Sequence, residues 1–187
     1  MSKPAQFLLV FETAWANLIT FNLDLWAVYY LISINITNYI FIAGFEGLFF
    51  VPGPLIMESL ISYWPAKKRV ITSTFCFMNL LVSIYFILVD EGSESYPHYL
   101  IIFFSLNFFA GAITSRQNGE TVETVRHNVL LKMVIINTIL LLKELFSALF
   151  FLILGYSMEK SNRSFIYSVA IINGVLLILH ITRRILE

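Results

Sequence analysis

Long apolar segments constrain this chain more than any other feature. Six can be read in the sequence, at residues 7–34, 39–61, 70–89, 99–114, 130–155 and 165–181. A helix needs about 20 predominantly apolar residues to cross the roughly 30 Å hydrocarbon core of a bilayer, and most of these segments reach or exceed that length. They show no alternating strand pattern, so a membrane β-barrel is not favoured. We therefore predict an all-α membrane protein in which residues 1–187 form one bundle of six transmembrane helices.

The composition agrees with a protein whose main partner is the lipid bilayer. Charged residues make up 13% of the chain, whereas soluble domains carry about 25%. The formal net charge is zero and no basic run with interleaved aromatics occurs, so we expect no nucleic-acid partner. The single cysteine, Cys76, excludes an internal disulfide framework and a cysteine-based metal cage. No metal-ligand spacing or nucleophile motif is visible either, so we predict no metal ion, no cofactor and no enzymatic activity.

The distribution of Lys and Arg predicts the orientation of the bundle. If the N-terminus is cytoplasmic, nine basic residues lie on the inner side and two on the outer side, with Lys143 left inside a segment. The inner residues are Lys3, Lys67, Lys68, Arg69, Arg116, Arg126, Lys132, Arg183 and Arg184; the outer ones are Lys160 and Arg163. Cytoplasmic loops carry an excess of Lys and Arg. Both termini are therefore predicted to be cytoplasmic, together with the basic connection Lys67–Arg69.

Polar side chains recur at helical spacing within the apolar segments. A polar stripe that faced lipid would leave its hydrogen-bonding groups in hydrocarbon, so we expect these stripes to point into the bundle. Asn, Ser and Thr commonly join helices, at about 0.6 kcal/mol per contact, and the alternative is that they line a polar path. The stripes are Thr13, Asn17, Thr20 and Asp24; Thr72, Cys76, Asn79 and Ser83; and Asn137, Glu144 and Ser147.

Lys143 and Glu144 stand side by side in the middle of segment 130–155. Each charge would cost about 2.5–3.5 kcal/mol at a bilayer centre. We predict that they line a solute or ion path with Asp24 and Glu46; an internal salt bridge, such as Lys143 with Asp24 or Glu46, is the alternative. Because neighbours on a helix point about 100° apart, we expect Lys143 and Glu144 to contact different helices rather than each other.

Three other titratable residues are expected to be less important. Glu12 and Glu58 are predicted to lie near the inner interface, where a long side chain reaches water at little cost. His180, near a cytoplasmic helix end, is predicted to cap carbonyl groups or meet lipid headgroups.

Pro52, Gly53 and Pro54 interrupt the second segment. Two prolines remove two backbone donors, so the helix is predicted to kink or unwind there. Broken helices at membrane depth are used by transporters at their binding sites. The alternative is a static kink that shapes the bundle.

The connection Ser59–Arg69, with the sequence SLISYWPAKKR, stands where one transporter family has Gly-x-Leu-Ala-Asp-Arg-x-Gly-Arg-Lys-Arg. With six segments and both ends inside, the layout resembles the N-terminal half of a major facilitator superfamily transporter. Ser59, Tyr63, Trp64 and Ala66 replace that family's Gly, Asp, Arg and Gly. The stretches Asp24–Trp26 and Ser62–Trp64 are also similar to segments of its ferroportin branch. That similarity implies an inorganic cation as the solute, with Asp24 as a possible ion contact.

This resemblance implies a membrane transport protein that moves a small solute or ion between its helices. Major facilitator proteins rock two six-helix bundles around a central site, and one bundle has nothing to rock against. A homodimer, or a complex with a partner half-transporter, is therefore predicted. The alternatives are a non-transporting membrane scaffold or assembly subunit, a truncated transporter half, and a substrate-capture subunit of a larger transporter.

Overall fold

The computed structural model describes residues 3–34, 48, 50–89, 96–124, 129–161 and 163–187, without the side chains of residues 21–25, 96 and 129. This part of the chain is all-helical, as predicted. Its elements are α1 (Lys3–Ser33), α3 (Pro52–Tyr63), the short 3-10 helix η1 (Pro65–Lys67), α4 (Lys68–Val89), α5 (Tyr96–Thr124), α6 (Val129–Met158) and α7 (Arg163–Leu186).

Four helices in the described ranges are long and apolar enough to cross a membrane. They cover Pro65–Val89, Pro97–Thr124, Leu130–Met158 and Arg163–Leu186, which fits an integral membrane protein. The first predicted segment is covered by α1. The second, residues 39–61, lies largely outside the described residues, and α3 forms its last part.

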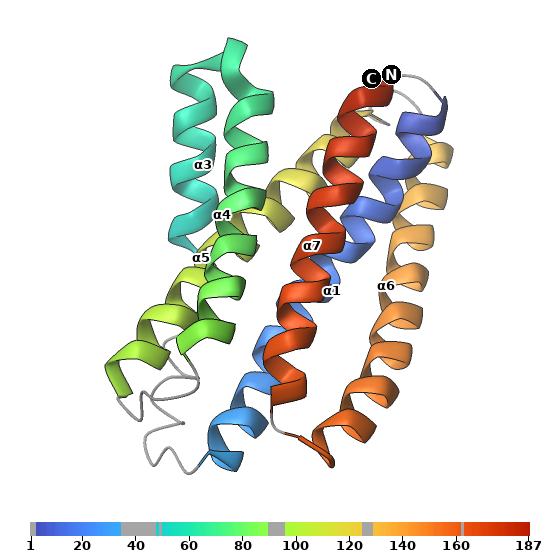
Figure 1. Ribbon diagram of the computed structural model, residues 1–187. Coiled ribbons are helices and arrows are strands. Elements are labelled where there is room, and N and C mark those ends of the chain that lie inside the picture. The colour runs from blue at the N-terminus through green and yellow to red at the C-terminus, as the bar shows by residue number, and fades with distance from the viewer. Residues whose placement is uncertain (1–2, 35–47, 49, 90–95, 125–128, 162) are drawn as a thin grey trace.

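The helices pack around α1, which contacts α5, α6 and α7. In Figure 1, α7 lies beside α1 at the centre, α6 lies at one edge, and α3 with α4 lies at the other. Both termini and the connection between α3 and α4 lie at one end of the bundle, which we call the terminal end, while the connection between α6 and α7 lies at the opposite end (Figure 1).

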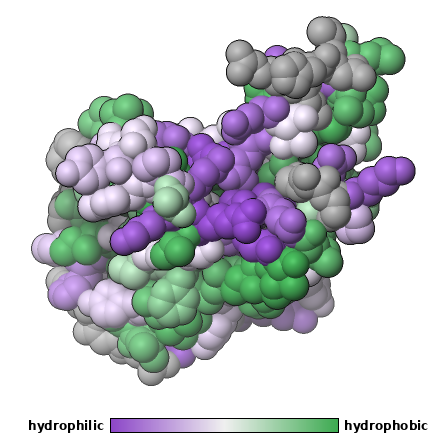
Figure 2. All heavy atoms as spheres, turned by 90° about the horizontal axis from the view of Figure 1, so that it is seen from above, coloured by the Kyte–Doolittle hydropathy of each residue, from purple (hydrophilic) through white to green (hydrophobic). Residues whose placement is uncertain are grey.

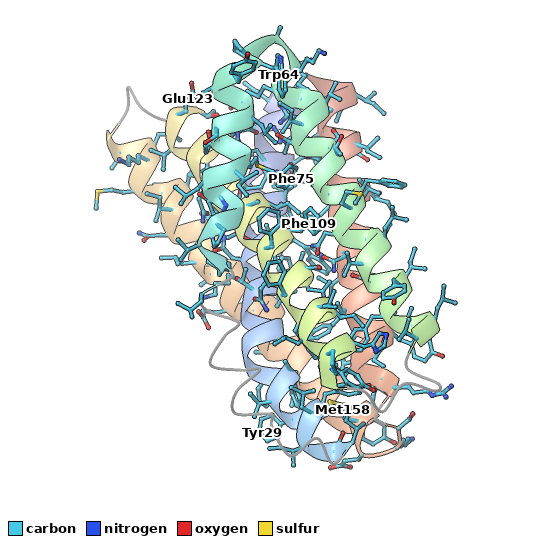
Figure 3. All side chains as sticks on the ribbon, turned by 90° about the vertical axis from the view of Figure 1, so that its left-hand side faces the viewer. Tyr29, Trp64, Phe75, Phe109, Glu123 and Met158 are labelled. Carbon is cyan, nitrogen blue, oxygen red and sulfur yellow. The ribbon has the colours of Figure 1, made fainter. Side chains whose placement is uncertain are left out.

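Aromatic side chains fill much of the core. Tyr30 of α1 lies 5.6 Å from the Phe86 ring and 5.2 Å from the Phe165 ring, measured between centroids, and all three side chains are buried. Phe75 and Phe109 meet between α4 and α5 at 5.6 Å (Figure 3). Such pairs are worth about 0.5–1.5 kcal/mol beyond the area that they bury. Aromatic pairs therefore supply much of the packing inside the bundle, while other aromatic side chains, such as Tyr63 and Tyr156, are exposed.

The fourth predicted segment was placed too short. The sequence suggested a span over 99–114 followed by a polar loop, but α5 continues to Thr124. The reason is that the polar residues of this stretch face neighbouring helices. Gln117 and Thr121 are buried, where they bond to Glu12 and Thr13 of α1. Hydrogen bonds across the bundle thus replace the water that a loop would need.

The Pro52–Pro54 stretch lies at the start of α3, where α3 packs against α5. Leu48 and Phe50 are helical, Val51 is a turn residue, and Pro52 begins α3. Proline fits the first turn of a helix because the N–H groups there have no helical partner. A side chain at Gly53 would come within 2.0 Å of the Phe108 carbonyl oxygen, so glycine lets α3 and α5 touch backbone to backbone.

Candidate functional site

A fully buried carboxylate, Glu12 of α1, lies at the centre of a polar cluster near the terminal end. It accepts hydrogen bonds from the Gln117 amide of α5 and from Nε of Arg183 on α7. Nδ1 of His180 lies 2.6 Å from the Oε1 atom of Glu12. A buried charge is tolerated only when it is paired and hydrogen-bonded, and the partners of Glu12 come from two other helices.

Arg183 extends the cluster toward the chain end. Its Nη2 atom donates to Glu120 at 3.0 Å and its Nη1 atom to Glu187 at 2.7 Å. Arg184 donates to the same two carboxylates, at 3.0 Å and 2.8 Å. Two adjacent arginines of α7 therefore share two acids, one of which belongs to α5.

Further ion pairs surround this core. Arg116 donates to both Glu58 oxygens, at 3.2 and 3.4 Å, and Lys68 lies 3.7 Å from Glu120. Among the described residues this network contains five acids and five bases, so its formal charges sum to zero. The members are Glu12, Glu58, Glu120, Glu123, Glu187, Lys68, Arg69, Arg116, Arg183 and Arg184. We call these ten residues the terminal-end network.

The position of His180 differs from the prediction that it caps carbonyls or meets headgroups. Its ring is buried, and its Nε2 atom lies 3.0 Å from the Ser73 hydroxyl of α4. A carboxylate–imidazole–hydroxyl chain is the arrangement that activates serine in hydrolases. Ser73 lies inside α4, however, where the neighbouring backbone N–H groups donate to carbonyl groups of the helix. These N–H groups form no oxyanion hole, so the Glu12–His180–Ser73 series is suited to joining α1, α4 and α7.

Glu187, beyond the end of α7, has a perturbed acidity. Burial alone would raise the pKa of its carboxyl group, but the hydrogen bond and charge of Arg184 and the charge of Arg183 together hold that pKa below its usual range. Arg69 lies 3.5 Å away and adds a link to α4. The carboxylate is therefore charged at neutral pH and ties the end of α7 to the start of α4.

Seen from above, the terminal end presents a band of hydrophilic side chains flanked by hydrophobic ones (Figure 2). A cavity of about 330 Å³ opens here, lined by Lys68, Arg69, Glu123, Arg184 and Glu187 among others. Its charged walls are those of the terminal-end network, and they already pair with one another.

A second cavity, of about 730 Å³, lies along α3 and is lined by Pro54, Leu55, Glu58, Ser59, Ser62, Tyr63 and Ser115. We call it the α3–α5 groove. Glu58 is 46% exposed here, while its partner Arg116 is only 10% exposed. The carboxylate thus faces the open space, and the guanidinium holds it from behind.

The stripe predicted on segment 70–89 does point inward. Thr72, Cys76, Asn79 and Ser83 are all buried. Asn79 donates to Asn173 of α7 at 2.8 Å, and Asn173 donates to Ser83 at 2.7 Å. Asn17 of α1 donates to Asn118 of α5 at 3.2 Å. These amides join helices, which was the simpler of the two roles considered for them.

The stripe predicted on segment 130–155 is wrong in part. Ser147 is buried, but Asn137 is exposed and the Glu144 side chain is 70% exposed. The Lys143 ammonium lies 3.5 Å from the Glu144 carboxylate, so the two neighbours do pair with each other. The physical reason is that α6 packs on α1 and, less closely, on α7. These two helices cover only one side of α6.

The remaining predicted residues are scattered. Glu46 lies outside the described part of the chain, as does the side chain of Asp24. Lys67 is exposed in η1, whereas Lys68 and Arg69 join the terminal-end network. In the described ranges, no group of three His, Cys, Asp or Glu side chains is placed to hold a metal ion.

The sequence analysis ranked Glu12 low and passed over Gln117, Glu120 and Arg183. A signal for them was present. Polar residues repeat every three or four positions from Arg116 to Thr124 and from His180 to Glu187, which is the spacing of one helix face. Reading both stretches as helix ends that face each other would have indicated the cluster.

Comparison with protein-family models, with curated proteins and with solved structures found no match to this chain.

Proposed function

We propose that this protein is a membrane transport protein that binds a small cationic solute in the α3–α5 groove. The observation that carries the proposal is a half-exposed carboxylate, Glu58, in a cavity of about 730 Å³. We further propose six membrane spans with both termini cytoplasmic, and assembly of two such units as a homodimer or with a partner half-transporter. On this orientation the groove lies in the cytoplasmic half of the bundle.

The chemistry of the groove favours a cation over an anion. The single guanidinium of Arg116 is shared between the carboxylates of Glu58 and Glu120, so it does not offer a free positive charge to an anion. Glu58 has an open side, and the hydroxyl groups of Ser59, Ser62 and Ser115 line the same space. Carboxylate and hydroxyl oxygens suit an inorganic cation or a small amine. Asp24 remains a predicted ion contact from the sequence resemblance, and Glu46 remains a predicted path residue because it is a carboxylate within an apolar segment.

Uptake into proteoliposomes tests this proposal. Purified protein would be reconstituted and challenged with labelled alkali cations, divalent cations and small amines, with protein-free liposomes as the blank. We expect uptake of at least one class, and a loss of at least tenfold in Glu58→Gln. Glu123→Gln is the matched control, because that acid lies at the same end but is 71% exposed and outside the groove.

The result that contradicts transport is a folded wild-type protein with no uptake of any class. An uptake that is equally strong in Glu58→Gln would contradict the groove as the binding site. Replacing Lys143 by Met together with Glu144 by Gln tests the path first predicted from the sequence. We expect uptake to persist, since the pair lies on α6, at the edge of the bundle opposite α3 (Figure 1), and the double replacement leaves no unbalanced charge there.

A second candidate function is a non-transporting scaffold or assembly subunit. The pairing of Glu12 favours it, because a carboxyl group held by three side chains is suited to rigidity rather than to exchange with a solute. The uptake experiment separates the two functions. A scaffold shows no flux at all, whereas a transporter shows flux that depends on Glu58.

A further inference from the structure

The least covered helix of the bundle carries a polar stripe at its centre. Lys143 and Glu144 are the fifteenth and sixteenth of the 30 residues of α6, which places them near the middle of a span long enough to cross the membrane. Asn137 precedes Glu144 by seven residues and therefore lies on the same face. Both Asn137 and Glu144 are exposed on the single bundle.

Such a stripe does not fit a surface that faces lipid. Ionisable residues within a span almost always face protein or a water-filled cavity. The residues that precede and follow Asn137 and Glu144 along α6 in alternating steps of four and three are apolar and also exposed: Leu130, Val134, Leu141, Ala148 and Phe151. Together with Asn137 and Glu144 they form one continuous face, which we call the α6 stripe. A spacing of seven residues is the pattern of helices that pack along their length.

We infer that a second copy of this chain covers the α6 stripe, with the two α6 helices side by side and parallel. Copies inserted in the same orientation are related by a two-fold axis along the membrane normal, so identical residues lie at the same depth. Each Glu144 then lies level with the partner copy's own Lys–Glu pair, and the four charges sum to zero. The amide of Asn137 is both donor and acceptor, so it can bond to its own copy across the axis.

The depth of the charges favours this arrangement over α6 packing on the α3 face of another copy. Glu58 lies five residues from the end of α3 at the terminal end, whereas Glu144 lies 15 residues below the start of α6. The end of α3 also projects beyond the start of α6 at the terminal end (Figure 1), so the two carboxylates lie at different depths. Figure 1 places α3 and α6 at opposite edges of the bundle. The interface therefore leaves the α3–α5 groove open in each copy, and the inference does not rest on the proposed transport function.

Disulfide crosslinking in membranes tests the interface. In a Cys76→Ala background, Ala148→Cys places a thiol on the α6 stripe, and Leu149→Cys is the matched control. Leu149 is exposed at nearly the same depth but points about 100° away around the helix. We expect oxidation to give a covalent dimer with Ala148→Cys at least tenfold more efficiently than with Leu149→Cys, in native membranes and with purified protein in liposomes.

A charge reversal provides a second measurement that does not depend on cysteine chemistry. Glu144→Lys alone leaves four positive charges at the axis in place of two of each sign, and we expect it to weaken dimerisation in liposomes at least tenfold, as measured by single-molecule photobleaching. Adding Lys143→Glu restores one charge of each sign per copy, so the double variant is expected to recover the dimer. Thermal unfolding curves of each variant in detergent would show that all of them fold.

Three outcomes overturn the inference. One is equal crosslinking at positions 148 and 149. Another is a protein that remains monomeric in liposomes at every protein-to-lipid ratio. The third is crosslinking of Ala148→Cys to a different polypeptide in native membranes while the purified protein stays monomeric, which would assign the α6 stripe to another membrane protein.

Discussion

Hydrogen-bonding side chains from two other helices enclose the buried carboxyl group of Glu12. Gln117, His180 and Arg183 approach it from α5 and α7. The separation in sequence between Glu12 and Arg183 is 171 residues, so this contact joins the two ends of the chain. Breaking a buried ion pair by removing one partner is far more harmful than breaking an exposed one, because a buried charge is left without compensation.

Glu12→Gln tests this asymmetry. We expect the free energy of unfolding to fall by about 1–3 kcal/mol, because the buried hydrogen bonds to the Glu12 carboxylate are lost or weakened, while Arg183 keeps Glu120 and Glu187 as counter-charges. Glu123→Gln removes an acid that is 71% exposed and 3.9 Å from Lys68, and an exposed pair contributes about 0–1 kcal/mol. Titration with a denaturing detergent, followed by circular dichroism, measures both variants. Equal stability of the two would show that Glu12 is not held as described.

The acidity of Glu187 makes a pH-dependent prediction. Because its pKa is lower in the folded protein than in the unfolded chain, its contribution to stability is present above the usual carboxyl pKa of about 4.3. That contribution is lost as the pH falls through the folded value. Glu187→Gln is therefore expected to lower the unfolding midpoint at pH 7 and to flatten its decline in acid. A variant whose acid decline matches the wild type would argue against the pairing of Glu187 with Arg183 and Arg184.

At the scale of the helices, the contact between α3 and α5 depends on two glycines. A Cβ atom at Gly53 would lie 2.0 Å from the Phe108 carbonyl oxygen, and one at Gly111 would lie 2.5 Å from the Phe50 carbonyl oxygen. Both close contacts are with backbone, which cannot rotate away as a side chain can. The α3–α5 groove therefore has a rigid floor at its Pro54 end.

Gly53→Ala and Gly119→Ala form a matched pair of substitutions for this contact. Both residues are helical, but a Cβ atom at Gly119 meets nothing within 4 Å. Alanine favours a helix over glycine by about 1 kcal/mol, so Gly119→Ala should stabilise the protein. Gly53→Ala should instead lower stability by roughly 1–3 kcal/mol through overpacking. Thermal melting in detergent compares them, and a stabilising Gly53→Ala would contradict the close approach.

Helices could be predicted from this sequence wherever a continuous apolar segment forms the helix. Residues 70–89 illustrate this, since α4 ends at Val89 and its predicted polar stripe is buried. The extension of α5 beyond Thr114 could not be found in the same way. Polar residues there are stabilised by partners on α1, α3 and α7, including Glu58 and Arg183, and no local window contains those partners.

Less of the candidate site than of the helices could be predicted from the sequence, because the site also depends on partners that are distant along the chain. An apolar helix with a polar stripe indicates that the stripe avoids lipid, but not which neighbour covers it. For Asn79 the cover is Asn173 within the same bundle. For Asn137 and Glu144 the described part of the bundle leaves the stripe exposed, because α6 packs at its edge. The identity of a neighbour is a property of the tertiary arrangement, and helical spacing alone does not contain it.

For the molecule as a whole, the positions of the termini and of the connections at the two ends of the bundle make the proposed orientation testable. Both termini and the η1 connection lie at one end, and the connection after α6 lies at the other (Figure 1). Whichever membrane contains the protein, Lys67 and Ser161 should therefore face opposite aqueous compartments. Both residues are exposed, and Cys76 is buried, so introduced thiols can be labelled against a low background.

We expect Ser161→Cys to react with a membrane-impermeant maleimide from the outer side of sealed cells or vesicles. Lys67→Cys should react only after permeabilisation, because its neighbours Lys68 and Arg69 belong to the basic, cytoplasmic side. The opposite labelling would place the termini outside and would also move the α3–α5 groove to the outer half of the membrane. Labelling of both positions from one side would contradict the bundle as a spanning unit, since α4, α5 and α6 separate these residues along the chain.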